Sequence, residues 1–262
     1  MEGVGVSQKL LQFLGWNPSA FPGFRNLQVQ TARCQTIVRA FYAFAVFKAL
    51  FDLDKWSEII SRDSLDPLWP VAWLGQGDPS DGIVLTILII HLASALVALI
   101  LPESRTARIV FFIAFFEMLA FRNSFGKINH WGHLILLVSF LLIFLPRGWA
   151  KNRPHRRLQI RITQVIQACL GVILVTYTMS GMGKIIVGLG QAVQGQPHAL
   201  APDALARHIA DRIGETGQVA YLADIFIQVP WLGWPLMLGA IYLQLTSIFI
   251  LFRPEVHRIW GA

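Results

Sequence analysis

The chain has 262 residues, of which 55% are hydrophobic and only 14% are charged, and its mean hydropathy is +0.54. A soluble domain carries nearer a quarter charged residues, so this composition excludes an ordinary soluble globular protein and indicates an integral membrane protein. The net charge of +7 does not indicate nucleic-acid binding, because Lys and Arg gather in short segments between apolar runs instead of along one solvated face.

The first 34 residues lack a short apolar core followed by a small-residue cleavage site, so we expect no removable signal peptide. Apolar runs of about 20 residues, the length that crosses a bilayer, follow from there. They predict an all-α polytopic helix bundle with about six transmembrane helices, at 35–53, 82–101, 108–125, 130–146, 162–187 and 231–252. The third and fourth are short because polar residues separate them, and we expect these two to form a hairpin.

Lys and Arg are distributed unequally between the two sides that this topology defines. One side, with both termini, the turn at 102–107 and the loop at 147–161, carries 13 of them, and the other carries 6. The positive-inside rule then places both termini in the cytoplasm. The expected organisation is a cytoplasmic segment over 1–34, a transmembrane domain over 35–252 and a cytoplasmic tail over 253–262.

Two outer loops differ from the basic inner ones. The loop at about 54–81 is acidic and carries aromatic residues of the type that lie at headgroup level. The loop at about 190–230 contains an amphipathic stretch from Asp203 to Glu215, followed by Gly217 as a helix stop. This stretch predicts either an interfacial helix or a lid over an outward-facing site.

The most informative residue is Lys184, near the far end of the apolar run from Ile162 to Leu189. A charge within a membrane segment costs a few kcal/mol, so it marks a partner, a cavity or a reaction. At 1.5 Å per residue, Lys184 lies about 33 Å along the helix, toward the outer side. Apolar surroundings favour a neutral amine, which is a competent general base or nucleophile. The alternative is that Lys184 reaches the headgroups or pairs with Glu117 or Asp52.

Other polar residues are expected at the same membrane depth. Asn129, His130 and His133 begin the fourth helix there, and Glu117 and Arg122 lie near the end of the third. A histidine or asparagine near Lys184 would hydrogen-bond a developing oxyanion. His130 and His133 have metal-compatible spacing, but no third ligand accompanies them in a motif, and the two cysteines, Cys34 and Cys169, belong to no cluster, so we predict no metal site.

Two segments resemble a known family. Asn129-His130 opens an apolar stretch that ends in Leu145-Pro146, and Tyr177-Thr-Met-Ser-Gly-Met-Gly-Lys184 follows. Together they resemble the horizontally transferred transmembrane (HTTM) proteins of bacteria, which share a membrane domain with vitamin K-dependent gamma-carboxylases. The resemblance implies that Lys184 is the base that deprotonates a quinol, that His130 assists, with Asn129 beside it, and that the protein lies in a bacterial inner membrane.

With this resemblance, we expect Tyr177, His133, Glu117 and Arg122 to contribute to substrate binding and a vitamin K-like quinone or quinol to be the cofactor. Because the sequence ends ten residues after the sixth predicted helix, we expect no large extramembrane region of the carboxylase type. Modification or maturation of a secreted peptide or protein is then the expected outcome. A similar run of tyrosine, glycine and lysine occurs in the DoxX-type, quinone-linked membrane proteins. The alternative is a non-catalytic membrane subunit that docks a partner protein.

Overall fold

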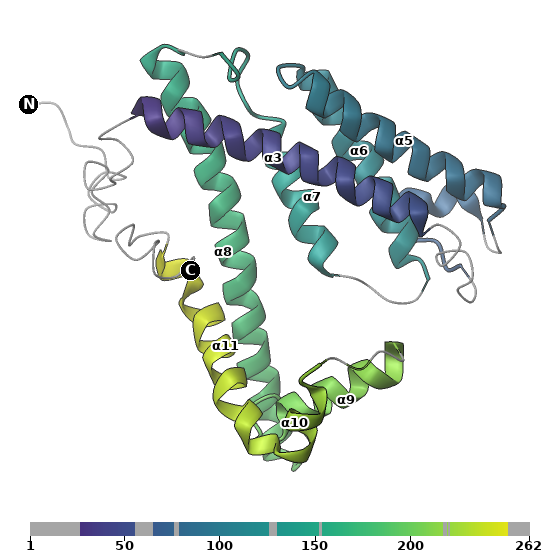
Figure 1. The fold of residues 1–262 in the computed structure, drawn as a ribbon, viewed down its shortest axis with the longest axis vertical. Coiled ribbons are helices and arrows are strands. Elements are labelled where there is room, and N and C mark those ends of the chain that lie inside the picture. The colour runs from purple at the N-terminus through teal and green to yellow at the C-terminus, as the bar shows by residue number, and fades with distance from the viewer. Residues whose placement is uncertain are drawn as a thin grey trace, which may run out of the picture. The chain divides into compact units, whose positions relative to one another are not determined.

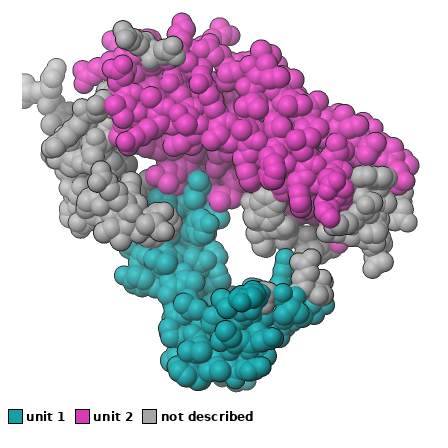
Figure 2. All heavy atoms as spheres, in the orientation of Figure 1, with its two compact units in different colours: residues 1–16, 173–262 teal, residues 17–172 magenta. Residues whose placement is uncertain are grey.

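The structure is a computed structural model, and it describes residues 27–55, 65–75, 79–125, 130–151, 154–216, 219 and 221–250. Within these residues every regular element is helical (Figure 1). The chain divides into two compact units, coloured separately in Figure 2: unit 2 is Asn17–Val172, and unit 1 combines Met1–Trp16 with Ile173–Ala262. Each unit is described by itself.

Unit 2 is a bundle in which successive helices pack on one another. The helix α3 contacts α5, α5 contacts α6, and α6 contacts α7 and the short 3-10 helix η1. Its core contains rings from two helices, since the imidazole of His91 lies 5.8 Å from the ring of Phe111 and 5.3 Å from that of Phe115. The elements of unit 2 are α3 (Leu27–Asp54), η1 (Trp69–Leu74), α5 (Asp81–Ile100), α6 (Arg105–Asn123), α7 (His130–Leu142) and the first part of α8 (Arg156–Val193).

The packing of α6 on α7 confirms the predicted hairpin of the third and fourth helices. It depends on Gly132, because a Cβ atom at this position would collide with the side chain of Leu119. A residue without a side chain therefore lets the two helices approach closely.

Unit 1 contains the rest of α8, followed by α9 (Ala204–Thr216), α10 (Ala223–Gln228) and α11 (Pro230–Ile250). The helices α8 and α11 run antiparallel (Figure 1), because Lys184 pairs with Gln244 while Thr178, earlier in α8, accepts a hydrogen bond from the later Ile248. The helix α9 packs on α10 and α11. The amphipathic stretch in the last outer loop is thus a helix, as expected, and its stop residue Gly217 lies outside the described residues.

Three helices are long and apolar enough to cross a membrane, namely α5, α8 and α11. They correspond to three of the six predicted spans, and α8 is longer than predicted at both ends. The other three predicted spans are also helical, but the fourth was predicted too long, because α7 ends at Leu142 and has 13 residues. A proline at 146 disfavours helical geometry just before it. The apolar helices indicate a membrane protein.

Candidate functional site

A row of polar side chains runs along one face of the C-terminal half of α8. Tyr177, Ser180, Lys184 and Gln191 are spaced three, four and seven residues apart, which is the spacing of one helical face. The ammonium nitrogen Nζ of Lys184 donates to Oε1 of Gln244 on α11 at 2.8 Å and to Oγ of Ser180 at 3.1 Å. Both acceptors are neutral, and the lysine is half-buried.

The position of Gln244 follows from a glycine one turn before Lys184. A Cβ atom on Gly181 would lie 2.9 Å from both Cβ of Gln244 and the backbone nitrogen of Leu245. Only a glycine therefore permits this approach of α11 to α8. The close approach brings the Gln244 amide within reach of the amine.

Lys184 lines a cavity of about 330 Å³ that lies within unit 1. The volume falls in the range of small-molecule sites. Its wall combines residues of α8, the segment that follows it, α9 and α11: Lys184, Gln191, Pro197, His198, Ala199, Ala204, Arg207, His208, Asp211 and Met237. The polar face of α9 thus borders the same cavity as the lysine, which is the arrangement that the lid interpretation requires.

Specific contacts fix α9 and the segment before it. The indole nitrogen of Trp234 donates to the carbonyl oxygen of Leu200 at 3.0 Å, and the guanidinium of Arg207 donates to the carbonyl oxygen of His198 at 3.0 Å. Arg207 also forms an ion pair of 3.2 Å with Asp203. The helix packs against Gly233 of α11, where a Cβ atom would lie 2.9 Å from the side chain of Leu205.

The polar groups of the cavity differ in their ion-pair and hydrogen-bond partners. Arg207 has a carboxylate partner, whereas Lys184 has only neutral partners among the described residues. Nδ1 of His198 is buried and has no hydrogen-bond partner there. Buried polar atoms without partners are rare in proteins and call for an explanation such as a ligand. The cavity therefore combines the amine of Lys184 with apolar side chains, which suits a small, partly apolar ligand that has an acidic hydrogen.

Several of the predicted site residues belong to unit 2 instead. Asn129 lies outside the described residues, and His130 begins α7, but its side chain is likewise outside them. Arg122 donates to the buried carboxylate of Asp52 at 2.7 Å, and Lys48 pairs with the same oxygen atom. Arg122 is thus engaged in an ion-pair cluster. The convergence of Lys184 with the Asn129-His130 pair stays a prediction.

Glu117 lines a different cavity, of about 400 Å³, inside unit 2. Its neighbours there include Trp73 of η1 and the hydroxyl-bearing Ser80 and Thr86 at the start of α5. His133 lies half-buried on α7 and takes part in an interaction of its own. Glu117, His133 and Arg122 therefore stand in the bundle of unit 2, and no described contact of theirs involves Lys184.

The sequence does not predict the hydrogen-bond partner of Lys184 on α11, nor the histidine that lines its cavity. Gln244 lies 60 residues after the lysine, and nothing in the spacing indicates which helix pairs with α8. His198 lies in a connecting segment without a motif. By contrast, Arg207, His208 and Asp211 had been identified as the polar face of a helix, and that amphipathic pattern was the available signal. Among the described residues, no group of three or more metal-ligating side chains gathers in one place.

Comparison with known proteins identifies no relative of this chain. No protein-family model, no curated protein and no solved structure matches this chain. The resemblance to the HTTM family therefore rests on the Asn129-His130 pair and on the segment from Tyr177 to Lys184.

Proposed function

We propose that the chain is a membrane enzyme in which Lys184 takes a proton from a lipophilic acid, with a vitamin K-like quinol as the best candidate. The observation that carries the proposal is the pairing of Lys184 with neutral groups in a cavity of ligand size. A lysine with a carboxylate partner is held as an ammonium ion, whereas the carbonyl of Gln244 and the hydroxyl of Ser180 position the amine without fixing its charge.

The proposed step is an acid–base reaction. The O–H bond of the quinol breaks, its proton moves to the lone pair of the neutral Lys184 amine, and the quinol oxygen keeps the bonding electrons. The resulting ammonium group stabilises the oxyanion beside it. Nδ1 of His198 is available to hydrogen-bond a second polar atom of the ligand. The anion is the reactive form for a later step, which would modify a secreted peptide or protein. In this proposal His130 assists Lys184 as the base, with Asn129 beside it.

The proposed setting is the bacterial inner membrane, with six crossings and both termini in the cytoplasm. Beyond the three long apolar helices, α3 and α6 have 28 and 19 residues, which at 1.5 Å each gives about 42 and 28 Å, enough to cross. The helix α7 has 13 residues, about 20 Å, so the sixth proposed crossing also needs the apolar residues 143–146 that follow it. A phosphatase that is active only outside the cytoplasm, fused after Ala262, should remain inactive. Activity of this fusion would contradict the proposed topology.

The function is tested by native mass spectrometry of protein in nanodiscs loaded with a naphthoquinol. We expect Lys184→Met, which keeps the length of the side chain but removes the amine, to reduce bound quinol by about tenfold or more. Lys184→Arg should retain binding but not the proton transfer, because a guanidinium stays protonated. Lys151→Met, a change at an exposed lysine of the other unit, is the matched control. Equal binding by wild type and Lys184→Met would contradict the proposal.

A second function is favoured by a different face of α8. Five exposed apolar residues recur there with alternating spacings of three and four residues: Met179, Met182, Ile186, Leu189 and Val193. This is the a/d pattern by which one helix packs against another. A non-catalytic subunit that docks the helix of a partner protein would use this face. The same mass spectra distinguish the two functions, since a stoichiometric protein partner without quinol in either variant would favour the docking subunit.

A further inference from the structure

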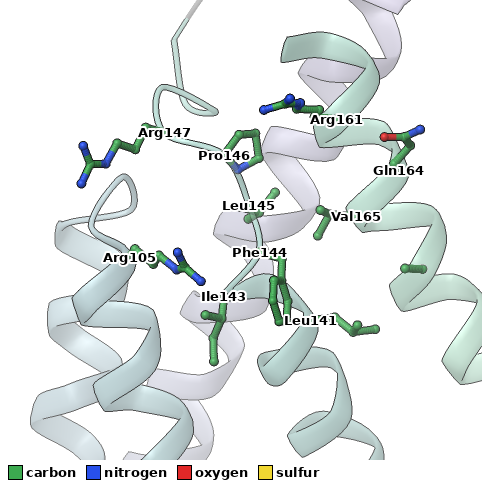
Figure 3. Close-up of a pocket in the computed structure, with 11 residues that line it drawn as sticks. Arg105, Leu141, Ile143, Phe144, Leu145, Pro146, Arg147, Arg161, Gln164 and Val165 are labelled. Carbon is green, nitrogen blue, oxygen red and sulfur yellow. The ribbon is translucent and has the colours of Figure 1, made fainter. Parts of the chain in front are cut away.

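Another cavity lies in unit 2, away from the residues discussed above. It has a volume of about 580 Å³ (Figure 3). Three arginines line it and come from three segments: Arg105 from the first residue of α6, Arg147 from the turn after α7, and Arg161 from the second turn of α8. In Figure 3 the side chains of Arg105 and Arg161 point toward the chain segment that ends in Pro146.

The three arginines are not neutralised within the described part of the chain. None of them forms an ion pair or a side-chain hydrogen bond with another described residue, and no acidic residue is among the described residues that line the cavity. Three positive charges around one hollow repel each other unless an anion lies between them. Guanidinium groups match phosphate in geometry, because their planar N–H groups bind two oxygen atoms at once.

Apart from Gln164, the other side chains that line the cavity are apolar. Leu141 and Phe144 contribute from α7 and the residues after it, and Val165 and Ala168 from α8. Phe144 and Ala168 are exposed. The arginine end of the cavity lies where the apolar run of α8 begins, one residue before Ile162. A charged end and an apolar wall at this boundary match a molecule with an anionic head and a hydrocarbon tail.

Buried contacts hold the wall of this cavity in place. The guanidinium of the buried Arg108 donates to the carbonyl oxygens of Pro102 and Leu145, each at 2.8 Å, and the indole nitrogen of Trp149 donates to Pro102 at 2.7 Å. The amide of Gln35 on α3 donates to the carbonyl oxygen of Trp149 at 2.6 Å. The segment that carries Arg147 is therefore fixed to two neighbouring helices before a ligand arrives, which reduces the entropy lost on binding.

We infer that this basic cavity is a binding site for an anionic phospholipid. The phosphate group lies between Arg105 and Arg161, whose side chains point toward the segment that ends in Pro146, and Arg147, whose side chain points away from this segment, adds positive charge at the edge of the cavity (Figure 3). An acyl chain lies against Leu141, Phe144, Val165 and Ala168. The charge distribution in the sequence predicts that this end of the helices faces the cytoplasm, where the anionic lipids of the membrane attract basic residues. Arg108 does not line the cavity, and its guanidinium instead donates to the carbonyl oxygens of Pro102 and Leu145.

The test uses the full-length protein in detergent, titrated with phosphatidylglycerol or with phosphatidylcholine, and native mass spectrometry counts the bound lipids. We expect wild type to retain phosphatidylglycerol in preference to phosphatidylcholine. Arg105→Gln and Arg161→Gln should each weaken retention of phosphatidylglycerol by about fivefold, and together by more. Arg157→Gln, which removes the same charge from an exposed position one turn before Arg161 but does not line the cavity, should have little effect.

A second variant separates a binding defect from a folding defect. Ala168→Trp keeps all three arginines but fills the space beside the apolar wall, so it should weaken lipid retention. Circular dichroism of this variant should show the same helix content as that of wild type and of Arg157→Gln. Inorganic phosphate distinguishes a lipid from a free anion, and millimolar phosphate should leave the bound lipid in place. Equal retention of both lipids, unchanged retention in the two arginine variants and in Ala168→Trp, or displacement by phosphate would each overturn the inference.

Discussion

Two charged sites, one in each unit, have different kinds of partner. In unit 2 the buried carboxylate of Asp52 accepts from both Lys48 and Arg122. The charge of this carboxylate is therefore neutralised by other groups of the same unit. In unit 1 Lys184 meets only the neutral side chains of Ser180 and Gln244 beside a cavity. A charge that the protein itself neutralises contributes to folding, whereas one left with neutral partners remains available to a ligand.

The largest effect is expected from breaking the ion-pair cluster of unit 2. Asp52→Asn leaves two cations beside a neutral amide, and the loss of one partner from a buried pair lowers the free energy of unfolding by about 3 kcal/mol. Thermal unfolding in detergent measures it. Asp54→Asn makes the same chemical change at an exposed position of the same helix and should leave the melting temperature almost unchanged. Equal melting temperatures of the two variants would show that the cluster contributes nothing.

The next effect concerns the contact between α8 and α11. Gly181→Ala places a Cβ atom 2.9 Å from the backbone of Leu245, so the helices must separate and we expect a loss of about 2 kcal/mol in unfolding free energy. Gly183→Ala, two residues later, meets no atom within 4 Å. Since alanine favours helix over glycine by up to about 1 kcal/mol, this control should stabilise the protein. Opposite signs are the expected result, and a gain for both variants would contradict the close approach.

A smaller effect is expected when Lys184 of unit 1 is given a carboxylate partner, as Lys48 already has in unit 2. Gln244→Glu places a carboxylate beside Nζ of Lys184, where the amide oxygen now lies at 2.8 Å. The new ion pair holds the lysine protonated, so bound naphthoquinol should fall about tenfold, equivalent to 1.4 kcal/mol, while the melting temperature does not fall. Gln191→Glu, at the far end of the same cavity, serves as the control. Undiminished binding in Gln244→Glu would remove the base from the proposed mechanism.

The smallest effect is expected at the second partner of the lysine. Ser180→Ala removes an exposed hydrogen bond of 3.1 Å, and we expect naphthoquinol binding to weaken by about 0.5 kcal/mol. Native mass spectrometry of the protein in loaded nanodiscs measures this loss. Gln244→Leu should have the larger effect of the two, because its bond is shorter and less exposed. A greater loss in Ser180→Ala would mean that the hydroxyl, and not the amide, positions the amine.

The sequence predicts helices better than it predicts contacts between them. Hydrophobic periodicity located the helices that became α5, α9 and α11 to within two residues, since each is bounded by polar or turn-forming residues. It overestimated α7, where an apolar run continues past the end of the helix. Membrane depth placed Lys184 beside residues of other helices, but depth does not determine which helix faces which, so Gln244 and His198 were not predicted.

The basic residues illustrate the same limit. Arg105, Arg147 and Arg161 entered the sequence analysis only as charges that determine the side of the membrane. Their shared cavity depends on the turn at Gly148, whose φ of +75° is a conformation that glycine adopts readily, and on the anchoring of Leu145 by Arg108. No motif in the sequence indicates that this turn and the hydrogen bond from Arg108 to Leu145 bring the three arginines together.

The contact at Gly181 also determines how the Lys184 cavity can change its size. The backbones approach so closely at Gly181 that this contact would serve as the pivot for a change in crossing angle, which moves each atom in proportion to its distance from the pivot. Lys184 lies about 4.5 Å along the axis from the pivot and Gln191 about 15 Å, at 1.5 Å per residue. A rotation of α11 against α8 would therefore widen the end of the cavity near Gln191 about three times as much as it would stretch the bond between Lys184 and Gln244.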